Sequence, residues 1–105
     1  MTQRYPERTS RPTMAATATL ANVAGSASSV TLLAANASRL GAVIMNDSSA
    51  SLYVKFGSTA STTSFTYLVV AGGTVELPTN AVYTGIITGI WASATGSARV
   101  TELTA

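Results

Sequence analysis

The chain has 105 residues, which is enough for one domain, and it contains no cysteine and no histidine. Only 10% of its residues are charged, with six Lys and Arg against four Asp and Glu. Little is therefore available for general acid–base catalysis, nucleophile activation or transition-metal binding, and a disulfide scaffold is excluded. We expect a binding or structural protein that is not an enzyme and uses no cofactor or metal.

The net charge of +2 is concentrated in the first eleven residues, where Arg4, Arg8 and Arg11 outweigh one acidic residue. In the rest of the chain, three basic residues balance three acidic ones. This segregation predicts an extended N-terminal arm over residues 1–27 and a folded domain over residues 28–105. A small core without disulfides or metals often gains stability by association, so we also expect a homo-oligomer, either a dimer or a trimer.

The arm carries Tyr5 among its arginines, and Tyr and Arg are both enriched at protein interfaces. Strong phosphate binding needs a dense basic patch, often with stacking aromatics, whereas the rest of the chain offers three separated basic residues. The composition therefore argues against nucleic acid as the partner. We expect residues 1 to about 20 to lie extended against another protein chain, with Arg4, Arg8 or Arg11 near acidic groups there.

Residues 14–27 imitate the apolar region and the cleavage site of a secretory signal, because small residues follow a basic start. The imitation is poor, since Thr17, Thr19 and Asn22 interrupt an already weak apolar run. No stretch of the sequence approaches the apolar length that spans a bilayer. We expect a protein that is made in the cytoplasm without a signal peptide and has no membrane partner.

Period-two alternation first appears over residues 30–34, which predicts a strand. Residues 40–46 are apolar on both faces, and residues 51–56 alternate most clearly, with Leu52, Val54 and Phe56 opposite Tyr53 and Lys55. The polar residues 46–50 between these two segments are typical of a turn. Together the two segments predict a β-hairpin.

Residues 57–64 are rich in Ser and Thr and predict an exposed loop. Segments 65–70 and 74–77, joined through Gly72 and Gly73, predict a second hairpin. Residues 84–91 predict a further strand, on which Gly85, Ile87, Gly89 and Trp91 share a face and the glycines leave space for a bulky neighbour. Residues 94–97 then turn the chain into a last strand over residues 98–103.

About seven strands without a helical stripe favour an antiparallel β-sandwich of jelly-roll or immunoglobulin-like type, with a small barrel as the alternative. Segments 42–45 and 67–70 are apolar on both faces. Either these are central strands, or one outer face is buried in an oligomer. The residues that we predict to be mostly buried are Val30, Leu32, Ile44, Leu52, Val54, Phe56, Val75, Ile90 and Val100.

Few residues qualify as catalytic or metal-ligating candidates. Glu76 and Glu102 could form a carboxylate pair of the kind that glycosidases use, but lone glutamates are more often surface solubilisers. Lys55 could activate a serine, although its strand pattern points it toward solvent. Asp47 lies in a polar turn whose single carboxylate is too little for a dedicated calcium site. We predict no catalytic, cofactor or metal residues.

Trp91 and the four tyrosines could stack on sugars, but core packing and interface anchoring are commoner roles for such side chains. The predicted protein-interface residues are Arg4, Tyr5, Arg8, Arg11, Tyr67 and Trp91.

A series of short phrases typical of β-structure runs along residues 29–103. They include Ser29–Asn36, Arg39–Gly41, Ile44–Ser48, Leu52–Gly57, Gly72–Gly73, Glu76–Pro78, Tyr83–Gly85, Gly89–Trp91 and Ala98–Glu102. In these phrases the sequence resembles a group of small structural proteins of tailed bacteriophages. The resemblance leaves the arm unmatched, and its phrases contain no catalytic signature.

The resemblance implies a virion protein, similar to the capsid cement or decoration proteins that bind and stabilise the shell. Its partner would then be the major capsid protein, and its location the capsid surface. A tail, neck or head-fibre component is the alternative, in which loop 57–64 and exposed aromatics contact host glycans. A nucleic-acid binder inside the virion ranks third, because it requires the arm to act on packaged DNA.

Overall fold

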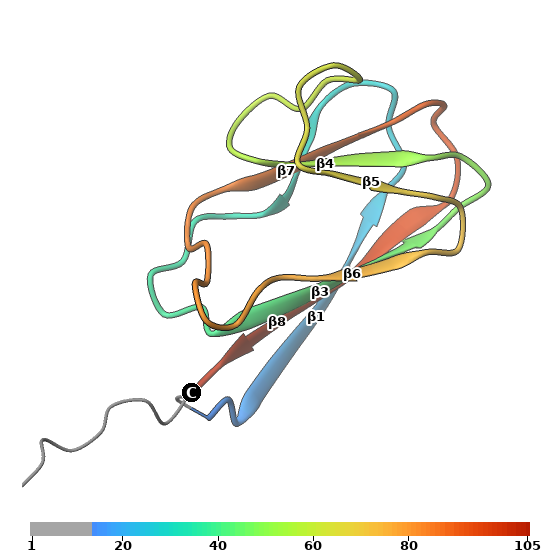
Figure 1. The fold of residues 1–105 in the computed structure, drawn as a ribbon. Helices are drawn as coiled ribbons and strands as arrows, with labels where there is room; N and C mark the ends of the chain where they lie inside the picture. Colours follow the sequence, from blue (N-terminus) through green and yellow to red (C-terminus); the bar gives the residue numbers. More distant parts are fainter. Residues whose placement is uncertain (1–13) are drawn as a thin grey trace, which may run out of the picture.

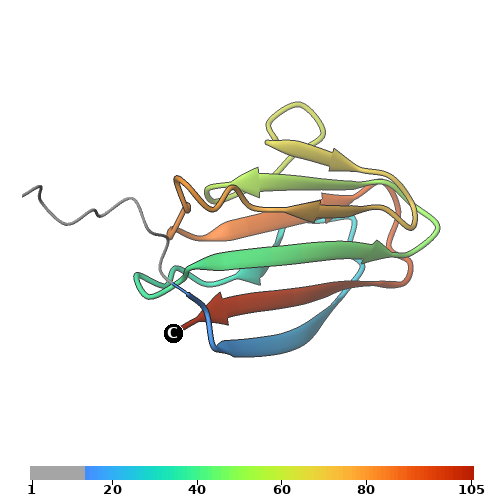
Figure 2. The same cartoon turned by 60° about the horizontal axis from the view of Figure 1, so that its bottom comes forward.

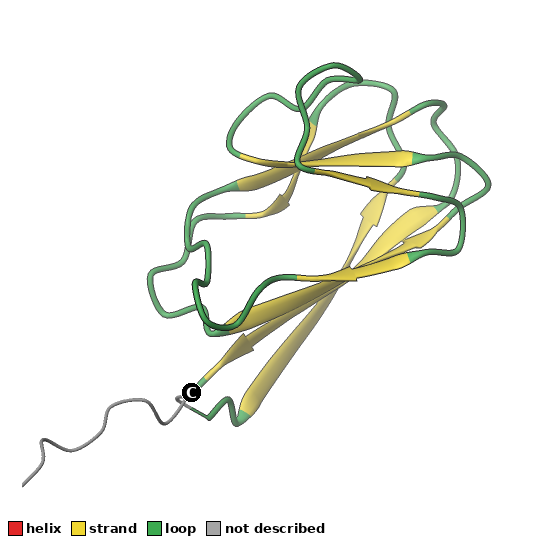
Figure 3. Ribbon diagram, in the orientation of Figure 1, coloured by secondary structure: helices red, strands yellow, loops and turns green. Residues whose placement is uncertain are grey.

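Eight strands arranged in two sheets make up the fold of residues 14–105, the part of the chain that the computed structural model describes (Figures 1 and 3). Alternating β-branched and other apolar residues favour this extended, half-buried backbone. Within residues 14–105, no helix is long and apolar enough to cross a membrane. The strands are β1 (Thr17–Ala24), β2 (Val30–Leu33), β3 (Gly41–Asp47), β4 (Leu52–Phe56), β5 (Tyr67–Val69), β6 (Thr74–Glu76), β7 (Ile87–Trp91) and β8 (Ser97–Thr104).

Each sheet has four strands. Sheet A has the order β1-β8-β3-β6, and sheet B has the order β2-β7-β4-β5. All neighbouring strands run antiparallel. The prediction of an all-β, antiparallel fold is confirmed, with eight strands in place of about seven.

The additional strand is β1, which lies inside the segment predicted as an arm. It pairs with β8 along its whole length, from Thr17 opposite Thr104 to Ala24 opposite Ser97. The sheet therefore begins at Thr17 and not at residue 28, because a backbone ladder needs no strongly apolar side chains. Residues 17–20, which we expected to lie against another protein chain, pair with β8 of their own chain. Arg4, Tyr5, Arg8 and Arg11 lie outside the described residues.

Both predicted hairpins are wrong, because the turns cross between the sheets. The turn after β3 leads from sheet A to β4 in sheet B, and the turn at Gly72 and Gly73 leads from β5 in sheet B to β6 in sheet A. Only β4 and β5 are consecutive along the chain and also neighbours in one sheet. The period-two pattern marks a strand but does not say which strand is its partner.

The core lies between the two sheets, and five of the nine residues predicted to be mostly buried are fully buried. Val30, Phe56 and Val75 are partly buried and pack against this core. Ile90 is partly buried as well, but it lies opposite Tyr53 on the outer face of sheet B. The five fully buried residues are Leu32, Ile44, Leu52, Val54 and Val100.

β7 forms the centre of the inner face of sheet B. Residues directly opposite in an antiparallel pair share a face, and Ile87, Gly89 and Trp91 lie opposite inward-facing residues of β4. A Cβ at Gly89 would come within 2.8 Å of Leu32 Cδ1 and 3.0 Å of Leu52 Cδ1. The predicted space above this glycine is therefore filled by leucines of the two neighbouring strands.

Candidate functional site

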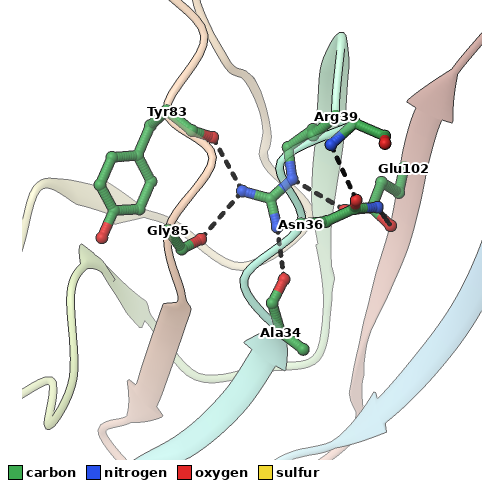
Figure 4. Close-up of polar contacts among 7 residues, drawn as sticks. Ala34, Asn36, Arg39, Tyr83, Gly85 and Glu102 are labelled. Atoms are coloured by element: carbon green, nitrogen blue, oxygen red, sulfur yellow. Dashed lines mark hydrogen bonds and ion pairs between the residues drawn. The ribbon is translucent and has the colours of Figure 1, made fainter.

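A buried arginine organises one end of the sandwich (Figure 4). Arg39, in the connection from β2 to β3, donates from Nε to Glu102 Oε2 of β8 at 2.8 Å. Its Nη2 donates to Ala34 O at 2.7 Å, and its Nη1 donates to Tyr83 O at 2.8 Å and Gly85 O at 3.0 Å. The side chain of Arg39 is inaccessible to solvent. The guanidinium thus joins two connections to sheet A.

Asn36 completes this cluster. Its Nδ2 donates to the other carboxylate oxygen of Glu102 at 3.2 Å, and its backbone N–H donates to Thr84 O at 2.8 Å. Its Oδ1 accepts the backbone N–H of Ser38 at 3.0 Å. Because each guanidinium nitrogen already donates to an oxygen of the protein, the cluster holds the fold together and presents no anion-binding face. The sequence indicated the charges of Arg39 and Glu102 but not their pairing.

A buried asparagine plays the corresponding role at the other end. Asn46 Nδ2 donates to Ala50 O at 2.8 Å and to Val69 O at 2.9 Å. Its Oδ1 accepts hydrogen bonds from Ser48 Oγ at 2.8 Å and Trp91 Nε1 at 3.2 Å. The amide therefore connects β3 in sheet A with β5 and β7 in sheet B, and it satisfies the indole N–H inside the core.

Two of the three aromatic residues predicted for an interface, Tyr67 and Trp91, lie mainly in the interior. Trp91 is only 1% exposed, so it packs in the core and does not anchor a partner from the surface. Tyr67 is half-buried, and its ring packs edge-on against Phe56 with the centroids 5.6 Å apart. Both side chains lie on inner-face positions, which the sequence pattern alone did not distinguish from outer ones.

The two glutamates considered as a carboxylate pair lie on opposite faces of sheet A. Glu102 is opposite Ala42, and Glu76 is opposite the next residue of β3, Val43. Since successive residues of a strand point to opposite faces, the two carboxylates are separated by the sheet. Glu102 is instead the partner of Arg39.

The remaining charged candidates lie on the surface. Asp47 forms an ion pair with Arg99, in which Asp47 Oδ2 lies 2.9 Å from Arg99 Nη2. Both side chains are about half exposed. Lys55 Nζ lies 3.4 Å from Thr59 O. Between residues 14 and 105, no group of three or more Asp and Glu side chains is placed to hold a metal ion. Four of the six charged side chains from residue 14 onward are thus taken up in two ion pairs.

Exposed and partly buried apolar side chains gather on the outer face of sheet B. Ile90, Tyr53 and Leu68 form a row across β7, β4 and β5. Phe65 packs edge-on against Tyr53 with the centroids 5.0 Å apart, and Val70 lies two residues beyond Leu68 on the same side. Phe65, Leu68 and Val70 are between 39% and 58% exposed. We call these five residues the sheet B patch.

The sheet B patch is the candidate site of this fold. It contains no charged residue, and its polar group is the hydroxyl of Tyr53, so its chemistry is to exclude water against a complementary surface. The apolar run at residues 67–70 indicated part of it. The contribution of Tyr53, Phe65 and Ile90 could not be read from the sequence, because it depends on strand order.

Comparisons with known proteins find no matching family model, no matching curated protein and no matching solved structure. The resemblance to bacteriophage structural proteins therefore stays a prediction.

Proposed function

We propose that this protein is a structural protein of a tailed-bacteriophage virion, a capsid cement protein that binds and stabilises the shell of major capsid protein. The observation that carries the proposal is the sheet B patch. An uncharged cluster of exposed Phe, Leu and Val side chains beside a partly buried Tyr is typical of a surface that docks on another protein. A capsid subunit is a partner of this kind.

The strand pairing supports a jelly roll as the finer description of the fold. The antiparallel pairs include β1 with β8, β2 with β7, β3 with β6 and β4 with β5, each nested inside the one before. Rolling up such a nested hairpin produces an eight-stranded double sheet, the architecture of many viral capsid and lectin domains. The immunoglobulin-like alternative has seven or nine strands in a different order.

The charge distribution supports a protein partner over nucleic acid. Arg39 and Arg99 are engaged with carboxylates, which leaves Lys55 as the one basic side chain without an ion pair within residues 14–105. This part of the chain therefore has no basic patch that could bind the phosphates of a nucleic acid. In our proposal the arginines of residues 1–13 contact acidic groups of a capsid subunit while the sheet B patch contacts a second surface, so that two weak contacts act together.

A tail, neck or head-fibre component is the second candidate, and one observation favours it. Phe65 is partly exposed beside the Ser- and Thr-rich loop 57–64, and an exposed aromatic ring with nearby hydroxyls can stack on a sugar. Copy number separates this candidate from the cement protein.

We expect a cement protein to be present in many copies over the shell, at a ratio near one per few major capsid subunits. The ratio is measured in purified particles by stained gel or quantitative mass spectrometry. Particles lacking the protein should then break at lower temperature, or under milder osmotic shock, than complete particles. A few copies per particle with normal shell strength would instead support the fibre candidate.

Removal of residues 2–12 should lower occupancy on purified capsids, because it eliminates one of the two proposed contacts. A variant with Arg4, Arg8 and Arg11 all replaced by Gln is the matched test, since it keeps the length of the segment and removes its charge. Undiminished occupancy of both variants would contradict a docking role for the arm. Binding that follows DNA content and falls steeply with salt would support the nucleic-acid alternative.

A further inference from the structure

One sheet edge of this fold lacks the features that usually protect edges from pairing with other chains. Of the four edge strands, β5 and β6 have three residues each, and β6 ends in the charged Glu76. β2 has four residues and an irregular register between Thr31 and Leu33. β1 has eight residues, an unbroken register, no charge and no proline. Figure 2 shows it, in blue, along the free edge of sheet A.

The register of β1 determines which of its backbone groups face outward. Gly25 N donates to Gly96 O at 2.8 Å in continuation of the β1–β8 ladder. Hydrogen-bonded pairs alternate along an antiparallel ladder, so the odd-numbered residues of β1 bond to β8. The N–H and C=O groups of Ala18, Leu20 and Asn22 therefore point to the free edge, where another strand can pair with them.

The side chains of β1 are also largely uncovered. Val23 is the one residue of this strand that packs against the core, and the other seven are exposed. Leu20, on the outer face, is 73% exposed and is the largest apolar side chain of the strand. β1 is thus held mainly by its ladder with β8, and a second strand alongside would bury side chains that the isolated chain leaves in water.

We propose that β1 pairs antiparallel with β1 of a second copy of this chain, about a twofold axis, so that two A sheets become one continuous eight-stranded sheet. The absence of charge favours this occupant, because self-pairing places no like charges opposite each other. The two copies of β1 can form backbone hydrogen bonds only in registers that place residues with outward-facing backbone groups opposite one another. Among them, the register centred on Leu20 brings the two Leu20 side chains together and places Ala18 opposite Asn22 of the second copy. This pairing is independent of the proposed capsid role.

Single cysteines test the register directly, because the chain has none of its own. Under mild oxidation, Leu20→Cys should form a disulfide-linked dimer, since directly opposite residues lie about 5.5 Å apart between Cα atoms. Ala18→Cys and Asn22→Cys are matched controls on the same strand. Neither should crosslink with itself, but a mixture of the two should give the crosslinked dimer.

Light scattering tests the pairing without crosslinks. The wild-type chain should show twice its mass of 10.7 kDa, whereas Leu20→Lys and Leu20→Glu should each show the single mass. An equimolar mixture of these two variants should recover the doubled mass, because opposite charges then face each other. Both variants should fold, because the Leu20 side chain that they replace is 73% exposed. The fluorescence of the buried Trp91 checks that they do.

Three results would overturn the proposal. One is a wild-type chain that stays at the single mass at every concentration reached. Another is an oligomer whose mass both Leu20 variants leave unchanged. The third is equal crosslinking of Leu20→Cys, Ala18→Cys and Asn22→Cys, which would indicate random collision in place of one register.

Discussion

Replacement of Arg39 by Met is expected to lower the free energy of unfolding by about 3–5 kcal/mol, the usual cost of removing one partner of a buried ion pair. The change leaves Glu102, whose side chain is 16% exposed, without its cation. It also removes the donor to the carbonyl groups of Ala34, Tyr83 and Gly85. Because the free energy of unfolding of a small domain is about 5–15 kcal/mol, this loss is a large part of its stability. Denaturant unfolding followed by Trp91 fluorescence measures it.

Arg99→Met is the matched control, because it removes the same kind of side chain from the surface pair with Asp47. That pair is about half exposed, so the expected loss is at most about 1 kcal/mol. The double variant Arg39→Met with Glu102→Leu should recover only part of the stability, since the carbonyls stay unpartnered. Equal stability of the Arg39→Met and Arg99→Met proteins would show that the buried cluster does not hold the fold.

Val54→Asp is expected to prevent folding. Val54 is fully buried at the centre of β4, and an unpaired carboxylate there would be enclosed by the aliphatic and aromatic side chains of the core. Burial of an isolated charge costs more than a small domain can offset, so the chain should lack a cooperative thermal transition. Circular dichroism during heating measures the transition.

Lys55→Asp provides the control for this substitution. The neighbouring residue points to the opposite face of β4, where Lys55 is partly exposed, so the same aspartate should leave a cooperative transition near that of the wild-type chain. A soluble Val54→Asp protein that melts cooperatively would mean that the inner face of β4 has been assigned to the wrong side.

The location of the strands was largely predictable, and their pairing was not. Residues 52, 54 and 56 alternate so regularly with 53 and 55 that strand and inner face follow from the pattern. The turn at residues 46–50, however, is equally compatible with a hairpin and with a crossing to the other sheet. In the structure its geometry is governed by Asn46, whose amide bonds to Val69 O and Trp91 Nε1, contacts between residues distant along the chain.

The same limit explains the functional surfaces. Tyr53 and Ile90 meet only because β4 and β7 are neighbours, and Arg39 meets Glu102 only because the end of β8 lies beside the connection before β3. The frequency of aromatic residues at interfaces predicts such a role for Trp91, but its indole N–H donates to Asn46 Oδ1 inside the core. For β1, the concentration of charge at the start of the chain predicts an arm, and the ladder with β8 is visible only in three dimensions.

The nested order of the strand pairs has a consequence for how the chain folds. The β4–β5 pair closes only the loop of residues 57–66, whereas the β1–β8 pair joins the two ends of the described chain. Each inner pair shortens the loop that the next outer pair must close, which lowers the entropy cost of that closure. Assembly from the β4–β5 hairpin outward is therefore the least costly route, and distant contacts make it slow. The outermost strand, β1, then joins last on this route and leaves first on unfolding.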